Sequence, residues 1–159
     1  KELSDLLHNE WWRHSKVGAW MIGLSGRLTL KNELANYLSK GLTYYSEHVL
    51  INLLMLEGKQ ARTEIFNFIE RQVKAALKKR DFLNIDRLSI EWGIAILYYL
   101  DEVYYSEYVE VIKNSSWWYN LYNAIEDERF HEMLDKILYP QTIIESIHLL
   151  MNRLKQFNL

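Results

Sequence analysis

Three stretches of the chain are apolar on every side of a helix, and they constrain the fold more than any other feature. They are Val17–Leu24, Val49–Leu56 and Ile90–Leu100. A helix without a polar face is stable in water only when other elements surround it. The sequence therefore predicts an inner layer of helices with other helices packed around it.

Each apolar stretch is followed by a helical stretch with one charged and one apolar face. These amphipathic stretches are Leu30–Lys40, Glu64–Lys79 and about Glu107–Lys113. An alternation of fully buried and half-buried helices is typical of stacked helix pairs. The intervals between successive pairs are unequal, so the stack is irregular, and a plain helical bundle is the alternative.

Start and stop signals separate the helices. Asp86 is placed to cap the start of the third apolar helix, and Gly58 to end the second in a left-handed conformation. Ser106 and Ser116 precede two shorter helices, and Pro140 occupies the first turn of the last one. We expect about ten helices in a single domain over residues 1–159, an all-α, irregular HEAT/armadillo-like stack of antiparallel helix pairs.

Composition excludes several classes of protein. The net charge of -2 produces no overall attraction to nucleic acid or acidic lipid. The absence of cysteine excludes thiol catalysis, disulfides and cysteine metal sites. The longest apolar runs are about eight residues, well short of the roughly 20 needed to cross a bilayer. With no secretory signal visible, we expect a cytoplasmic protein without a membrane anchor.

Three segments carry a family resemblance. Glu10–Leu24 contains a Trp-Arg pair, a basic residue and an Ala-Trp-Met-Ile-Gly-Leu run, and Tyr44–Gly58 is a Tyr-led apolar helix that ends in glycine. Asn84–Asp101 contributes an Asp, a Trp, an Ala and a closing Leu-Asp pair. Together they resemble an uncharacterised bacterial family, domain of unknown function 6000.

The resemblance covers about residues 10–101 and implies a HEAT-like helical fold. The chain departs from the family at Ile51, Leu53 and Ile94, where the family has small alanines. Because the family has no assigned activity, the resemblance implies no catalytic residues.

Two Glu-x-x-His motifs, Glu128/His131 and Glu145/His148, raise the possibility of a metal site. In carboxylate-bridged di-iron bundles, two such helices and two single glutamates converge on the metals. Further acids that could complete the site are Glu47, Glu91 and Glu102.

Two arguments count against a metal site. At about 100° per residue, Glu128 and Glu145 lie nearly opposite the apolar faces of their helices, with the histidines off to one side. The motifs also lie on consecutive helices, whereas the di-iron fold places a helix between them. We therefore expect no metal and no cofactor, and a metal-dependent enzyme is the alternative hypothesis.

His48 and Asn52 lie on a helix that is otherwise apolar. We expect both to be buried and hydrogen-bonded to backbone or to a carboxylate such as Glu47. The chain contains no nucleophile elbow, Gly-rich phosphate loop or Walker-type lysine. The sequence therefore does not favour an enzyme.

A basic run closes the longest amphipathic helix and raises a nucleic-acid-binding alternative. Its members are Arg71, Lys74, Lys78, Lys79 and Arg80. Cations at a helix C-terminus are favoured by the helix dipole, which explains the run without a ligand. A nucleic-acid groove would also need Lys31, Lys40 and Lys113 on neighbouring helices.

Aromatic doublets are the most distinctive pattern. They are Trp11-Trp12, Tyr44-Tyr45, Tyr98-Tyr99, Tyr104-Tyr105 and Trp117-Trp118. Adjacent helical residues point about 100° apart, so we expect one member of several doublets to line a groove or ridge. The predicted partner-binding residues are Trp11, Trp12, Arg13, Tyr45, Tyr99, Tyr105, Trp117 and Trp118. The sequence thus favours a non-enzymatic helical-repeat domain that binds a protein. The role we expect for such a domain is that of a bacterial interaction or immunity-like adaptor.

Overall fold

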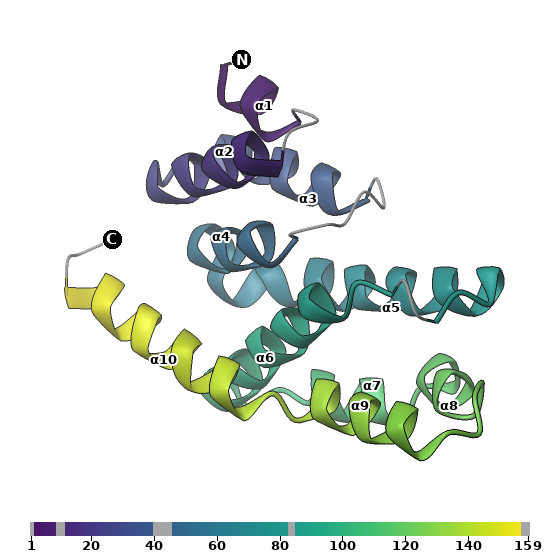
Figure 1. Ribbon diagram of the computed structural model, residues 1–159. Coiled ribbons are helices and arrows are strands. Elements are labelled where there is room, and N and C mark those ends of the chain that lie inside the picture. Colours follow the sequence, from purple (N-terminus) through teal and green to yellow (C-terminus); the bar gives the residue numbers. More distant parts are fainter. Residues whose placement is uncertain (1, 9–11, 40–45, 83–84, 157–159) are drawn as a thin grey trace.

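The computed structural model describes residues 2–8, 12–39, 46–82 and 85–156 (Figure 1). Over these residues the fold is all-α, with 85% helix and no strand, which confirms the predicted class. None of the described helices is both long and apolar enough to cross a membrane.

The first half of the chain forms five α-helices and two short 3-10 helices. They are α1 (Glu2–Leu7), α2 (Trp12–Leu24), η1 (Leu28–Leu30), α3 (Lys31–Ser39), α4 (Glu47–Glu57), η2 (Gly58–Gln60) and α5 (Ala61–Lys79). The second half forms α6 (Arg87–Tyr104), α7 (Tyr108–Lys113), α8 (Ser116–Tyr122), α9 (Glu128–Leu138) and α10 (Gln141–Gln156). Among the described α-helices, α1 and α7 are the shortest, with six residues each.

Two helices form the interior. Figure 1 shows α1, α2 and α3 at one end of the molecule, α4 and α5 in the middle, and α7 to α10 around the far side of α6. Helix α4 packs against α2, α3, α5 and α6, while α6 packs against α4, α5, α7, α9 and α10. The apolar helices α2, α4 and α6 thus contact one another in series.

Burial follows the sequence pattern in α4 and α6. Residues 49–54 of α4 are all buried, as are residues 93–97 of α6. This confirms the prediction of inner helices for the second and third apolar stretches. The first apolar stretch behaves differently, because only one face of α2 is buried.

Asp86 caps α6 as the sequence predicts, whereas the cap of α8 lies one residue earlier than predicted. The Asp86 side chain accepts a hydrogen bond from the Ser89 N–H at 3.2 Å, as expected of an N-cap. Gly58 has φ +53 after the last turn of α4, a conformation that favours glycine. Ser115, one residue before the expected Ser116, caps α8.

The start of α7 is capped by Asp101, from the last turn of the preceding helix α6. The Asp101 carboxylate accepts the N–H groups of Tyr108 at 3.1 Å and Val109 at 2.9 Å. Ser106, the expected cap, donates its hydroxyl to the same carboxylate at 2.6 Å. Asp101 therefore fastens α7 to the end of α6.

Candidate functional site

The inward face of α2 combines three small residues with the fully buried side chain of Ile22. A Cβ at Gly18 would lie 2.6 Å from the backbone N of Leu7, and one at Gly23 would lie 1.8 Å from Asn52 Oδ1. Ala19, between them, is fully buried. Only residues this small allow α1 and α4 to approach α2 so closely.

The outward face of α2 carries large apolar residues. Val17, Met21 and Leu24 are 50%, 49% and 51% exposed. Their spacing of four and three residues places them in one row along the helix. Leu28 in η1 is also exposed, at 60%. We call these four residues the α2 outer face.

The prediction that the first apolar stretch is wholly buried is therefore wrong. Gly18, Ala19, Ile22 and Gly23 occupy the inward side, whereas Val17, Met21 and Leu24 lie on the opposite side and stay about half exposed. Sequence reasoning missed this surface, although the small residues Gly18 and Gly23 were a signal of which side faces inward.

An apolar groove lies at the C-terminal end of the α2 outer face. It has a volume of about 290 Å³ and is lined by Gly23, Leu24, Ser25, Gly26, Met55, Met151, Leu154 and Lys155. Unbranched methionine side chains adapt to partners of different shape. Among the described residues that line this groove, only Lys155 is charged. We call it the α2–α10 groove.

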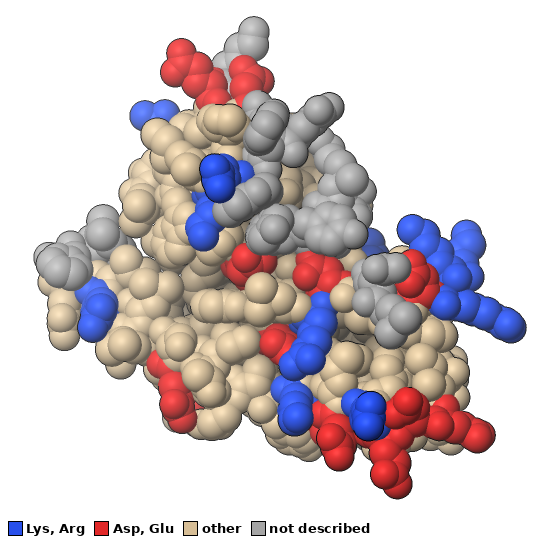
Figure 2. Space-filling model, viewed as in Figure 1, with Lys and Arg blue, Asp and Glu red and all other residues tan. Residues whose placement is uncertain are grey.

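Helix α2 carries basic residues near its start, and the charge of Lys16 acts on Glu47 of α4. The helix contains Arg13, His14 and Lys16 and no acidic residue. Arg13 and His14 are exposed. Figure 2 shows basic side chains among neutral surface in the region of α2. At the other end, Arg27 and Glu2 line the same surface hollow.

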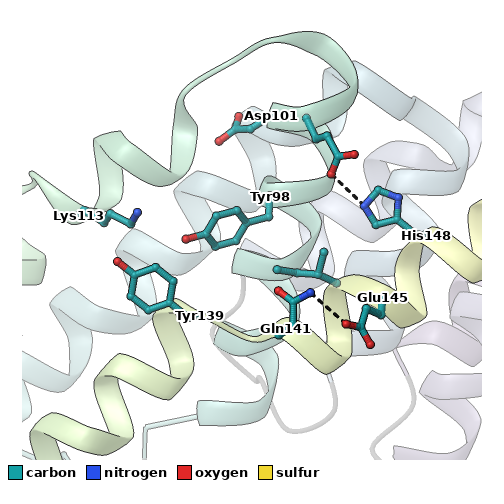
Figure 3. A pocket seen from close by; sticks show the side chains of 9 residues that line it. Tyr98, Asp101, Lys113, Tyr139, Gln141, Glu145 and His148 are labelled. Atoms are coloured by element: carbon teal, nitrogen blue, oxygen red, sulfur yellow. Dashed lines mark hydrogen bonds and ion pairs between the residues drawn. The ribbon is translucent and has the colours of Figure 1, made fainter.

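A second, polar pocket lies between α6, α7 and α10 (Figure 3). Its volume is about 600 Å³, and it is lined by Tyr98, Asp101, Glu102, Lys113, Tyr139, Gln141, Ile144, Glu145 and His148. Figure 3 shows the ends of Tyr98, Lys113 and Tyr139 directed toward one another. The pocket therefore combines an aromatic end with an acid–imidazole end.

At the aromatic end, the positive charge is already compensated within the protein. Lys113 Nζ lies 5.8 Å from the centroid of the Tyr98 ring and 5.0 Å from that of Tyr139. It also donates to Glu110 Oε1 at 2.6 Å, which raises the pKa of Lys113. These contacts leave Lys113 little capacity to attract a free anion.

At the other end, His148 pairs with an acid from another helix. His148 Nε2 lies 3.2 Å from Glu102 Oε2, and the imidazole packs edge-on against Tyr99. Glu145 accepts a hydrogen bond from Gln141 Nε2 at 3.0 Å. The two members of the Glu145/His148 motif thus have separate partners.

The other Glu-x-x-His motif lies elsewhere. The His131 ring stacks on Tyr122 with a centroid distance of 4.3 Å, and its Nε2 lies 2.9 Å from the Tyr122 carbonyl oxygen. Glu91 forms an ion pair with Arg87 at 2.7 Å. In the part of the chain that the structure describes, no group of three or more Asp, Glu or His side chains is arranged to hold a metal ion.

A buried polar cluster joins α4 to the start of α6. Ser89 Oγ donates to Glu47 Oε2 at 3.5 Å, and His48 Nε2 lies 3.3 Å from Glu47 Oε1. Asn52 Nδ2 donates to the His48 carbonyl oxygen at 2.7 Å. Asn52 is fully buried as predicted, whereas His48 is only half-buried, and the contacts of both are consistent with the predicted structural role.

Burial disfavours charge in this cluster. It raises the pKa of Glu47, and the nearby Asp86 carboxylate raises it further. Burial and the positive charge of Lys16 lower the pKa of His48 to about 4. Burial likewise raises the pKa of Asp86. The cluster is explained by helix packing and has no open face in the described pockets.

The predicted partner-binding residues fall into three sets, which are exposed, buried or outside the described residues. Tyr105 is 96% exposed, and Arg13 is exposed too. Tyr99, Trp117 and Trp118 are buried, so their expected place on a binding ridge is wrong. Trp11 and Tyr45 lie outside the described residues, as does the side chain of Trp12.

Packing explains why both tryptophans of one doublet are buried. The Trp117 ring packs edge-on against Phe66 of α5 and against Trp118. Helix α8 lies against both α5 and α7, so two of its faces are covered. In the Tyr98-Tyr99 doublet, Tyr98 lines the polar pocket while Tyr99 is in the core.

The basic run of α5 does not continue onto neighbouring helices. Figure 2 shows Lys and Arg side chains at the end of α5, with acidic side chains gathered below them. Lys74 pairs with Glu70 at 2.9 Å, and Lys31 pairs with Glu57 at 3.2 Å. Lys40 lies outside the described residues. The run therefore does not extend into a basic groove within the described residues.

Comparison with known proteins finds no match to a family model, to a curated protein or to a solved structure.

Proposed function

We propose that the chain is a non-enzymatic helical domain that binds a protein partner through the α2 outer face. The observation that carries the proposal is the row of Val17, Met21 and Leu24, each about half exposed. Contiguous exposed apolar surface on a soluble protein is characteristic of interaction sites. The row also continues into the α2–α10 groove through Leu24.

The other exposed apolar residues do not form such a row. Val103, Tyr104 and Tyr105 at the end of α6 are exposed but consecutive, so they point in different directions. Val111 on α7 and Leu149 on α10 are each 54% exposed, and each is the one large apolar residue so exposed among the described residues of its helix. Single exposed apolar residues are normal on protein surfaces. Leu149 is therefore a suitable control position for tests of the α2 outer face.

We extend the proposal to the architecture and the biological class. Serial contact of α2, α4 and α6 supports an irregular HEAT/armadillo-like stack of helix pairs. Kinship with domain of unknown function 6000 is proposed on the segments that resemble it, which include α2, α4 and α6. A cytoplasmic role as a bacterial interaction or immunity-like adaptor suits a helical binding domain, by analogy with such folds.

The proposal is tested by replacing one residue of the row. Met21→Glu places a charge in the centre of the α2 outer face, where an apolar partner would have to desolvate it. We expect recovery of partner proteins from native-host lysate, measured by quantitative mass spectrometry, to fall about tenfold or more.

Leu149→Glu is the matched control, because it adds the same charge at an equally exposed position. Circular dichroism and urea unfolding should show that both variants remain folded. If Met21→Glu recovers the same partners as the wild type in the same amounts, the α2 outer face is not the binding surface.

A further inference from the structure

We propose that the polar pocket between α6, α7 and α10 binds a small organic cation, an ammonium or guanidinium group on an apolar stem. The pocket is separate from the α2 outer face, because no residue of that face lines it. The volume of the pocket, its uncompensated negative charge and its spare hydrogen-bond acceptors all point to such a ligand.

The pocket has the size of a small-molecule site. Its volume of about 600 Å³ lies within the range of about 300–1,000 Å³ that is usual for such sites. Ile144 and the ring of Tyr98 are partly buried and supply apolar walls. Apolar walls with a few well-placed polar groups are typical of sites for small organic molecules. The pocket therefore has room for a stem of several carbon atoms.

The negative charge at the acid–imidazole end is not cancelled within the protein. Glu102 pairs with His148, and Glu145 accepts from the amide of Gln141. An amide, or an imidazole in its neutral form, donates a hydrogen bond without cancelling the charge of a carboxylate. In the part of the chain that the structure describes, neither glutamate forms an ion pair with a lysine or an arginine.

The other two charged residues of the pocket are already used by the fold. Lys113 donates to Glu110, which offsets its charge, and Asp101 accepts three hydrogen bonds at the start of α7. Figure 3 shows Lys113 and Glu145 on opposite sides of the pocket. A cation therefore meets the carboxylates of Glu102 and Glu145 at the side away from Lys113.

Hydrogen-bond capacity also favours a ligand that donates. The nitrogen donors Lys113 Nζ, Gln141 Nε2 and His148 Nε2 each already face a glutamate. An ionised carboxylate has about four acceptor sites, whereas an ammonium or guanidinium has about three to five N–H donors. A metal ion is a less suitable cation, because no group of three or more described Asp, Glu or His side chains is arranged to hold one.

The test compares three small molecules with the same six-carbon stem, namely hexylamine, hexan-1-ol and hexanoate. Their head groups are cationic, neutral and anionic. Each is added to the full chain, labelled at the isoleucine δ1 methyl groups, and binding is followed by NMR. The signal of Ile144, assigned with Ile144→Val, reports the pocket. The signal of Ile51, which is buried in α4, is the internal reference.

We expect hexylamine to bind at least about fivefold more tightly than hexan-1-ol, and hexanoate to bind least. High salt should weaken the binding of hexylamine. Glu102→Gln and Glu145→Gln should each weaken it about two- to threefold, as expected for exposed charges, and the double variant should weaken it further. Glu132→Gln on α9 is the matched control, because it removes one exposed charge outside the pocket.

Nα-acetyl-lysine amide carries the same ammonium on a peptide unit, so it distinguishes two sources of the cation. Tighter binding than hexylamine would assign the cation to a lysine side chain of another protein. Weaker binding would assign it to a free amine. Both results support a cation site in this pocket.

Equal affinity for hexylamine and hexan-1-ol would overturn the inference. So would an unchanged Ile144 signal at about 10 mM hexylamine, or equal weakening by Glu145→Gln and Glu132→Gln. Met21→Glu should leave hexylamine binding unchanged, so failure of this site and failure of the α2 outer face are distinguishable.

Discussion

Among single residues, the neighbours Glu47 and His48 on α4 have pKa values that burial shifts in opposite directions. The pKa of His48 is lowered to about 4, so the folded protein resists its protonation. The pKa of Glu47 is raised, so the folded protein favours its protonation. Burial favours the neutral, protonated form of Glu47. A neutral Glu47 stabilises a proton on the adjacent imidazole less than a carboxylate would.

The His48 shift predicts a loss of stability in mild acid. An unfolded chain binds a proton at His48 near its ordinary pKa of 6.5, whereas the folded chain does so only near pH 4. As the pH falls through this window, protonation favours the unfolded state, at a cost of up to about 3 kcal/mol. Urea unfolding from pH 7.5 to pH 4 should show this loss in the wild type and a smaller one in His48→Gln.

Glu47 contributes with the opposite sign, since its stabilising protonated form is present at low pH and lost as the pH rises through its raised pKa. Glu47 is present in both proteins, so the difference between wild type and His48→Gln reports His48 together with its contact with Glu47. Identical pH dependence in the two proteins would show that His48 titrates normally in the folded state.

At the scale of elements, the close approach of α1 to α2 depends on a glycine. A Cβ at Gly18 would meet the backbone N of Leu7 at 2.6 Å and its Cα at 2.8 Å. Backbone atoms cannot turn aside as the end of a flexible side chain can. Helix α1 would have to move away from α2 to make room.

We therefore expect Gly18→Ala to destabilise the protein by about 1–3 kcal/mol, the usual cost of overpacking, despite the better helix propensity of alanine. Thermal and urea unfolding measure the change. Val17→Ala on the outward face is the control and should change stability by no more than about 0.5 kcal/mol. A neutral or stabilised Gly18→Ala protein would contradict the described packing of α1 on α2.

The element scale also shows the limits of local capping signals. Asp86 was predictable because an N-cap and its helix are adjacent in sequence. Asp101 was not identified as the cap of α7, because it reaches Tyr108 and Val109 across a turn that brings α7 back to the end of α6. Only the path of the chain between the two helices makes that contact.

At the scale of the whole molecule, α4 and α6 are the helices that the others surround. Amide protons in the interior exchange only when the protein opens globally, whereas those of peripheral elements exchange through local opening. We expect the amides of α4 and α6 to be the most protected in hydrogen exchange, and those of α1 and the end of α10 to be among the least. Faster exchange in α6 than in α1 would contradict the assignment of α6 to the interior.

The tryptophans show how far aromatic patterns predict a surface. Two adjacent aromatic residues on an isolated helix point in different directions, which led to the expected ridge at Trp117 and Trp118. Both are buried because α8 lies between α5 and α7. The prediction that Tyr105 contacts a partner stays open, and its 96% exposure leaves it accessible.

Local patterns predicted which segments are helical and that residues 49–54 and 93–97 are interior, because apolar periodicity and end signals are local along the chain. The side of α2 that faces outward is instead set by packing between helices. That choice depends on contacts of Gly18 with Leu7 and of Gly23 with Asn52, which come from other helices. An all-apolar helix has no polar face to mark its solvent side, so its neighbours alone determine which of its residues stay exposed for a partner.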